Sequence, residues 1–321
     1  MADLKTKYMG LELRSPIIAG SCGLTSDVEK MVEMEKAGVG AVVLKSIFEE
    51  QINEETSGVF KAGYGMGDAY PEAEDYIKAY IRSNTIQKYV ELVRNAKSRL
   101  TIPVIASVNC FSGGEWVSFA RQLEEAGADA LELNVFILPV NEFKESAEVE
   151  NVYFEIVKSI KSQIKIPVSV KISHYFTNLS AFVDKIKAYG ANATTLFNRF
   201  YEPDININTL EMGAASVFST AAELRTTLRW TGILAGKDKK LEISASTGVH
   251  GGEAAVKLLL AGATTVQVCS VLYEKGIHVI EDINNFIGKW MDSKAFKTIG
   301  DYRGMLSYSS IENPDLYERA Q

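Results

Sequence analysis

A short phrase that occurs four times in the sequence limits its possible folds more than any other feature. In each copy, the end of a helical pattern is followed by a glycine and then by a run of mostly apolar residues. The four glycines are Gly38, Gly127, Gly190 and Gly262. A glycine in this place is typical of a helix that ends in a left-handed cap, and the apolar run is typical of a buried strand. The phrase therefore predicts the joint between a helix and the next strand of a βα repeat.

Four more strands complete a regular alternation of strands and helices. Three apolar runs begin at Pro16, Pro103 and Pro167, and a fourth run covers 241–245. At the first position of a strand, a proline removes no hydrogen bond from the interior of the sheet. Helical periodicity is found at 26–37, 84–99, 115–126, 147–163, 178–189, 220–234, 252–261 and 276–291. Eight strand–helix units predict an α/β chain folded as a (β/α)8 TIM barrel, in a single domain over 1–321. A doubly wound open sheet is the alternative, but no Gly-x-Gly-x-x-Gly follows the first strand.

Charge and cysteine content exclude several classes of function. The chain has 34 basic and 41 acidic residues, and its longest basic run is 237–240, so we expect no nucleic-acid partner. No apolar stretch approaches the ~18 residues of a membrane helix, and the first residues hold no apolar signal core. We therefore expect a cytoplasmic protein without a membrane partner. Cys22, Cys110 and Cys269 lie far apart, which argues against a disulfide framework or a metal site.

Polar residues follow nearly every predicted strand, at the end where a barrel carries its active site. Extended loops are expected after strands 2, 4 and 6, at about 47–83, 136–146 and 199–219. The polar residues and glycine at the strand ends are Ser21, Cys22, Lys45, Ser46, Asn109, Asn134, Lys171, Asn198, Ser246, Thr247, Gly248 and Ser270. Because the carboxyl ends of barrel strands meet at one mouth, these side chains should converge on a planar, polar, electron-accepting or anionic ligand.

The last two strands carry the features of a phosphate site. The loop Thr247-Gly248-Val249-His250-Gly251-Gly252 precedes a helix, and Ser270 follows strand 8. Many barrels bind phosphate between the loops after strands 7 and 8 and a helix N-terminus. Glycine lets the backbone approach the ligand closely, and the hydroxyl groups can donate to phosphate oxygens.

At these residues the chain resembles the dihydroorotate dehydrogenase family, in particular class 1 and its dihydroorotate dehydrogenase-like branch. The resemblance runs over nearly the whole chain, through the phrases at 8–18, 44–46, 131–134, 170–172 and 260–268. It implies an FMN-dependent flavoprotein that transfers a hydride between flavin N5 and a CH–CH bond. The substrate would be dihydroorotate, as in pyrimidine biosynthesis, or a related small molecule. It also implies a homodimer, and it leaves the electron acceptor open.

The resemblance also assigns roles to individual residues. The implied FMN contacts are Ser21, Cys22, Lys45, Ser46, Asn134, Lys171, Ser246, Thr247, Gly248 and Ser270. The implied substrate contacts are Lys45, Gly65, Met66, Asn134 and Asn198. Lys171 would lie by the N1/O2 edge of the flavin, where negative charge develops on reduction, and a fixed ammonium stabilises that charge.

The chain departs from the family where the family carries its base. After the strand 4 asparagine the family continues with Ser-Cys-Pro-Asn, and this cysteine removes a proton from dihydroorotate. Here Asn134 is followed by Val135-Phe136-Ile137, so Ile137 takes the place of the cysteine, and an isoleucine cannot accept a proton. The candidates for another base are Cys110, Ser112 and His174.

Two other functions remain open from the sequence. One is a flavin-binding family member that has lost its catalytic activity, which the missing cysteine favours. The other is a flavin-free lyase in which Lys45 or Lys171 forms a Schiff base with a phosphorylated substrate.

Overall fold

Eight parallel strands close into a barrel within the residues that the structure describes. The structure is a computed structural model, and it describes 2–48, 71–109, 113–199 and 202–319. The barrel strands are Ile17–Ala19 (β3), Ala41–Val43 (β4), Val104–Asn109 (β6), Ala130–Asn134 (β7), Val168–Ile172 (β8), Ala193–Leu196 (β9), Glu242–Ala245 (β12) and Thr265–Val268 (β13). Their spatial order is β4-β3-β13-β12-β9-β8-β7-β6, and pairing of β4 with β6 closes the circle. The closure confirms the TIM barrel and excludes the open sheet.

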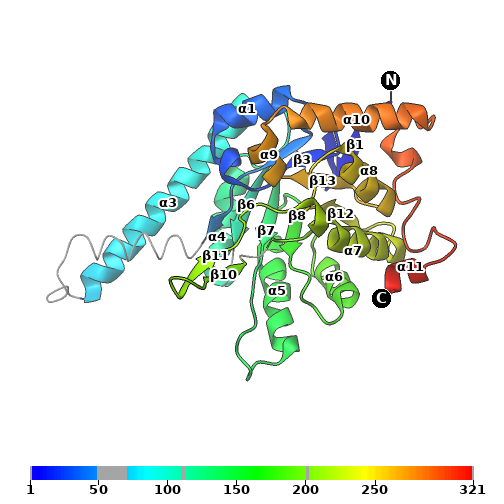
Figure 1. The fold of residues 1–321 in the computed structure, drawn as a ribbon. Coiled ribbons are helices and arrows are strands. Elements are labelled where there is room, and N and C mark those ends of the chain that lie inside the picture. Colours follow the sequence, from blue (N-terminus) through cyan, green and yellow to red (C-terminus); the bar gives the residue numbers. More distant parts are fainter. Residues whose placement is uncertain (1, 49–70, 110–112, 200–201, 320–321) are drawn as a thin grey trace.

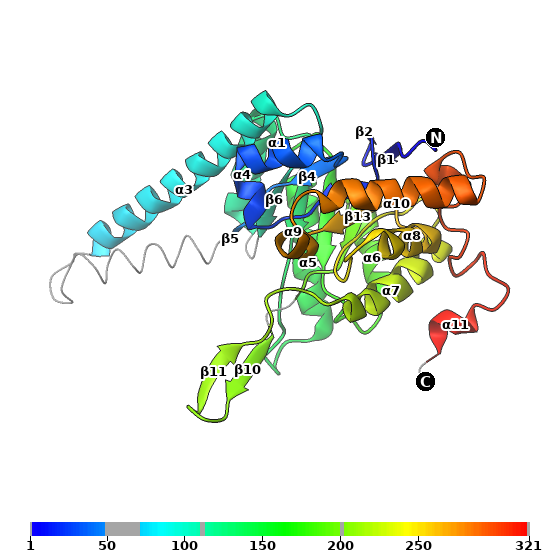
Figure 2. The ribbon, with the colours of Figure 1, turned by 45° about the horizontal axis from the view of Figure 1, so that its top comes forward.

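Helices surround the barrel, and two segments extend away from it (Figure 1). The α-helices are Val28–Lys36 (α1), Pro71–Arg99 (α3), Gly113–Glu125 (α4), Ser146–Lys161 (α5), Leu179–Ala188 (α6), Leu224–Lys237 (α7), Gly252–Ala261 (α8), Ser270–Lys275 (α9), Val279–Ser293 (α10) and Asp315–Glu318 (α11). Short 3-10 helices cover Gly23–Ser26, Ala221–Glu223 and Ile299–Asp301. The first half of α3 and the hairpin of Pro203–Asn206 (β10) with Glu211–Ala214 (β11) lie outside the barrel body (Figure 2).

The repeated glycine joint has the predicted conformation. Gly38, Gly127, Gly190 and Gly262 have φ angles of 94°, 97°, 111° and 120°, in the left-handed region. Each follows the end of a helix and precedes a barrel strand. Only glycine adopts this conformation without a steric cost from Cβ, so the four positions fix where the helices end.

Several predicted boundaries were wrong. The helix expected over 276–291 is α10, which begins later, at Val279, because Gly276 adopts a φ of 85° and ends the unpredicted helix α9. The loop expected to reach residue 83 ends earlier, since α3 already begins at Pro71. The loop expected over 199–219 contains the β10–β11 hairpin, whose exposed strands lack a continuous apolar pattern.

A hairpin that the sequence patterns did not predict closes the bottom of the barrel. Thr6–Tyr8 (β1) pairs antiparallel with Leu11–Leu13 (β2). Its apolar side chains pack against the inward residues at the start of the strands, in a cluster of Tyr8, Met9, Leu13, Ile18, Ala41, Val43, Ile105, Ala130 and Ala193. Within the described residues, these side chains therefore fill this end of the barrel.

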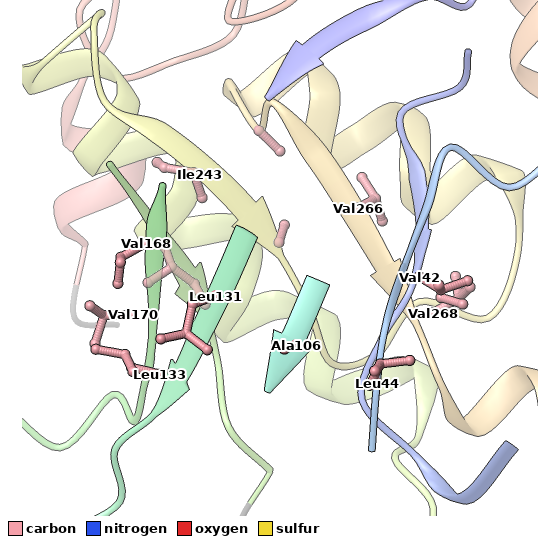
Figure 3. Packing of buried hydrophobic residues seen from close by; sticks show 14 of the residues in the cluster. Val42, Leu44, Ala106, Leu131, Leu133, Val168, Val170, Ile243, Val266 and Val268 are labelled. Atoms are coloured by element: carbon pink, nitrogen blue, oxygen red, sulfur yellow. The ribbon is translucent and has the colours of Figure 1, made fainter. Parts of the chain in front are cut away.

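Residues on the strands alternate between the helices and the barrel interior. The helix-facing set is apolar and includes Val42, Leu44, Leu131, Leu133, Val168, Val170, Val266 and Val268 (Figure 3). Because side chains along a strand alternate between its two faces, the intervening residues face the interior. Much of this inner set is polar: Ser169 and Thr265 lie nearer the start of their strands, and Glu132, Lys171, Thr195 and Gln267 lie nearer the carboxyl ends. The fold thus directs buried polar groups towards the open mouth.

Candidate active site

One cavity at the carboxyl ends of the strands brings together most of the predicted site residues. It has a volume of about 350 Å³, within the range of roughly 300–1,000 Å³ that is usual for small-molecule sites. Its lining includes all ten residues expected to contact a cofactor, together with one expected to contact substrate: Ser21, Cys22, Lys45, Ser46, Asn134, Lys171, Asn198, Ser246, Thr247, Gly248 and Ser270. They come from the ends of seven different barrel strands, as convergence at the barrel mouth requires.

The remaining predicted residues lie elsewhere or are not described. Ile137 is half-buried beside the core, and its backbone N–H donates to the Tyr153 hydroxyl over 3.2 Å. His174 lines an adjoining cavity of about 580 Å³, which shares Phe197, Asn198, Arg199 and Thr247 with the first cavity. Burial lowers the pKa of His174, which keeps its imidazole neutral near pH 7. The predictions at Gly65, Met66, Cys110 and Ser112 fall outside the described residues.

Beneath the cavity, the carboxylate of Glu132 anchors a buried hydrogen-bond network that the sequence analysis missed. Glu132 is 1% exposed and accepts from the Gln267 amide over 2.8 Å and from the Thr195 hydroxyl over 2.9 Å. Its other oxygen, Oε1, has no hydrogen-bond partner. A charged residue inside an apolar strand phrase, at an inward position, was the available signal for this group.

The same network holds the ammonium of Lys171. Lys171 is 8% exposed, and its Nζ lies 3.4 Å from Gln267 Oε1. Gln267 therefore links a buried cation to the buried carboxylate of Glu132. The nearby opposite charge offsets part of the cost of burying an ammonium. Lys45 differs, because it is exposed at the mouth.

A line of hydroxyl groups forms a second rigid wall of the cavity. Ser46 Oγ lies 3.0 Å from Ser21 Oγ and 2.7 Å from Ser107 Oγ. The hydroxyl of Tyr89 in turn donates to the Ser107 carbonyl over 2.8 Å. These contacts cross three strands and fix the orientation of polar groups before any ligand binds.

At the opposite end, the loop before α8 has the close backbone approach expected of a phosphate site. Thr247 and Gly248 have φ angles of 80° and 78°. A Cβ at Gly248 would lie 2.2 Å from the backbone nitrogen of Leu224, so no other residue fits there without movement. The N-terminus of α8 follows this loop at Gly252, and a helix N-terminus favours an anion.

Ser219, which the sequence analysis missed, connects this end of the cavity to a histidine and a glutamate. Its backbone N–H and hydroxyl donate to Ser270 Oγ over 3.0 and 3.1 Å. Its hydroxyl also lies 3.4 Å from His250 Nε2, and His250 Nδ1 lies 3.1 Å from Glu274 Oε2. The carboxylate can only accept, so Nδ1 carries a proton. Since the Ser270 hydroxyl oxygen accepts from Ser219, its own proton is available to a ligand in the cavity.

Two classes of feature were not found in the described part of the chain. None of its helices is both long and apolar enough to cross a lipid bilayer. No group of three or more histidine, cysteine, aspartate or glutamate side chains in these ranges is arranged to hold a metal ion.

Comparison with known proteins gives consistent matches over almost the entire chain. The family model for dihydroorotate dehydrogenase matches residues 3–291. The catalytic subunit of dihydroorotate dehydrogenase B (NAD(+)) from Thermoplasma acidophilum is 30% identical over 311 residues, which cover 95% of this chain and 99% of the relative. The corresponding Thermoplasma volcanium subunit is 27% identical, with coverage of 95% and 99%. A putative dihydroorotate dehydrogenase A (fumarate) from Aeropyrum pernix is 26% identical, with coverage of 94% and 97%.

Proposed function

Because the chain belongs to the dihydroorotate dehydrogenase family, an oxidoreductase family that acts on CH–CH bonds, we propose that it is an FMN-dependent dehydrogenase of dihydroorotate or a closely related cyclic substrate. The observation that carries the proposal is the single cavity at the barrel mouth, which all ten expected cofactor residues line. Family membership favours this reaction over the Schiff-base lyase that the two lysines alone would allow.

The chemistry of the cavity wall fits FMN. The loop 247–252 with Ser270 offers backbone and hydroxyl donors for the phosphate, next to the N-terminus of α8. Lys171 offers a fixed positive charge for the polar edge of the ring, held from behind by Gln267. Asn134 Oδ1 is buried without a hydrogen-bond partner, so it is free to accept from an N–H group of a bound ring. Bound FMN would supply the hydride acceptor, its N5 atom.

On the substrate side, two asparagines and an exposed lysine provide the contacts. Asn198 is held in place because its amide donates to the Lys171 carbonyl over 3.3 Å. Asn134 and Lys45 line the same cavity and would orient a polar ring with an acidic group. These side chains would hold a substrate next to the cofactor.

The proton must be accepted by a residue other than Ile137. Among the candidates from the sequence, His174 lines the adjoining cavity. Its lowered pKa leaves a neutral imidazole, which can act as a base near pH 7. We therefore propose His174 as the proton acceptor for a substrate bound where the two cavities adjoin, beside Asn198, which lines both.

The first test is the visible absorption spectrum of the purified protein. We expect a yellow protein that releases FMN on denaturation and whose flavin band bleaches when dihydroorotate is added without oxygen. A colourless protein that does not take up added FMN would refute the proposal. A yellow protein that neither dihydroorotate nor related substrates bleach would instead support a non-catalytic family member.

The electron acceptor can be tested in the same preparation. The relatives are named for NAD⁺ and for fumarate, and we propose NAD⁺, reached through a separate subunit, on the basis of the two Thermoplasma proteins. The reduced protein alone should then be reoxidised by artificial acceptors but slowly by fumarate. Rapid reoxidation by fumarate would contradict this choice.

Whether a cysteine at position 137 can serve as the base is tested by Ile137→Cys, with Ile137→Val as the size-matched control. If His174 serves as the base, His174→Gln should abolish flavin bleaching in the wild-type background, while Ile137→Cys should restore it. Unchanged bleaching in His174→Gln would exclude His174 from the reaction.

A further inference from the structure

Two free cysteines from opposite ends of the sequence meet in the wall of the cavity. Cys22 follows β3 and Cys269 follows β13, and these strands are parallel neighbours with Ala19 paired to Val268. The Cys269 thiol lies against the turn after β3, where its Sγ is 3.9 Å from the Ser21 carbonyl oxygen. Both residues line the cavity, and their side chains are close enough for each to shift the pKa of the other.

The surroundings of the two sulfur atoms shift their pKa values in opposite directions, which favours a reactive pair. The hydrogen bond from Cys269, supported by the backbone N–H groups of Leu24 and Thr25, lowers the pKa of Cys22 to about 6. Cys269 keeps its proton, because its hydrogen bond to Cys22 and its burial raise its pKa. At neutral pH one sulfur is therefore a thiolate and the other a thiol. A thiolate is the nucleophilic form, and a neighbouring thiol can resolve its oxidation product.

Gly20 leaves room for this arrangement. A Cβ at Gly20 would lie 2.6 Å from Cys269 Sγ, so the glycine gives the Cys269 side chain space to turn towards the β3 loop. The pairing therefore depends on the close approach of two neighbouring strands and not on a flexible surface loop.

We propose that Cys22 and Cys269 form a peroxide-reactive site that closes reversibly to a disulfide in the cavity wall. The Cys22 thiolate attacks one peroxide oxygen, the O–O bond breaks, and the sulfur is oxidised to a sulfenic acid while the second oxygen leaves as water after protonation. The Cys269 sulfur then attacks the sulfenic sulfur, the S–OH bond breaks, and its thiol proton leaves with the hydroxyl as a second water. In total, two thiols and one peroxide give one disulfide and two waters.

The test is thiol mapping of the purified full-length protein after treatment with one equivalent of hydrogen peroxide. Free thiols are alkylated under denaturing conditions, and the digested protein is analysed by mass spectrometry. We expect a linked peptide that contains Cys22 and Cys269, one remaining alkylated cysteine at Cys110, and recovery of three free thiols with dithiothreitol. Three free thiols after a treatment that oxidises free dithiothreitol would overturn the proposal, as would a linked peptide that contains Cys110.

Two variants separate the roles of the sulfurs. Cys269→Ser should stop at the sulfenic acid, which dimedone traps at Cys22, and Cys110→Ser is the matched control that should still form the linked peptide. Dimedone labelling at Cys110 and not at Cys22 in Cys269→Ser would refute the assignment of Cys22 as the attacking sulfur. The linked peptide in the wild type decides the proposal even if a variant does not fold.

Discussion

Replacing Gln267 by leucine tests whether the buried hydrogen-bond network beneath the cavity stabilises the protein and supports FMN binding. Gln267 is 2% exposed and connects Glu132 with Lys171 through contacts of 2.8 and 3.4 Å. Leucine has a similar volume, so the change removes both polar contacts and leaves little empty space. Glu132, whose Oε1 already lacks a partner, would keep the Thr195 hydroxyl as its hydrogen-bond donor.

The size of the effect follows from the kind of hydrogen bond that is lost. A bond to a charged group contributes roughly 1.5–3 kcal/mol, whereas a neutral pair contributes about 1 kcal/mol. The contact with Lys171 is near the distance limit and adds little. We therefore expect Gln267→Leu to lower the free energy of unfolding by about 2–3 kcal/mol. For a chain of this length 1 kcal/mol shifts the melting temperature by about 1.5 °C, so the expected fall is roughly 3–5 °C.

Thr265→Val on the same strand is the matched control. Its hydroxyl donates to Ser244 Oγ over 2.9 Å, so the substitution removes one neutral buried hydrogen bond at constant volume. The free energy of unfolding is measured for both variants by urea denaturation, and FMN affinity is measured by quenching of flavin fluorescence. Gln267→Leu should lose more stability than Thr265→Val and should bind FMN more weakly, because Lys171 has lost its acceptor. Equal losses in the two variants would refute the claim that Gln267 supports the charged pair.

Three further substitutions or titrations test other parts of the structure. Gly248→Ala should weaken FMN binding at least tenfold relative to riboflavin binding, because the new Cβ would lie 2.2 Å from Leu224 N and displace the phosphate loop; equal affinity changes for the two ligands would contradict a phosphate site there. The rate of Cys22 alkylation should rise with pH through a midpoint near 6, since the thiolate is the reactive form and the hydrogen bond from Cys269 lowers the pKa of Cys22 to about 6; a midpoint above pH 8 would exclude this effect. Asp27→Ala should cost about 1 kcal/mol of stability in urea denaturation, because the Asp27 carboxylate accepts from two N–H groups at the start of α1; an unchanged unfolding midpoint would show that this cap contributes nothing.

The barrel fold and the set of residues at its mouth could be predicted from the sequence, because both follow from local sequence patterns. Left-handed glycine caps such as Gly38 and Gly262 mark where helices end, and the apolar runs after them mark buried strands. Once the strands are parallel and closed, the residues after them meet at one end, whatever their separation in sequence. This is why Ser21, Lys171 and Ser270 could be assigned to one cavity without coordinates.

The helices and strands that could not be predicted from the sequence are those without a periodic sequence pattern of their own. The N-terminal hairpin at 6–13 is too short to give a periodic signal, and it is stabilised by packing beneath the barrel. Helix α9, Ser270–Lys275, is likewise too short to show a helical period, and Gly276 separates it from α10. In both cases contacts with the rest of the fold decided between local alternatives.

The sequence by itself determined the order of strands and helices, the positions of the glycine caps and the polar residues at the mouth, because each of these follows from near neighbours in the chain. Only the tertiary structure joined Glu132 to Gln267, Ser219 to His250 and Cys22 to Cys269. The physical reason is that hydrogen bonding and thiol acidity depend on distances of a few ångströms. Between residues as many as 247 positions apart, these distances are set by strand pairing and side-chain packing across the closed barrel.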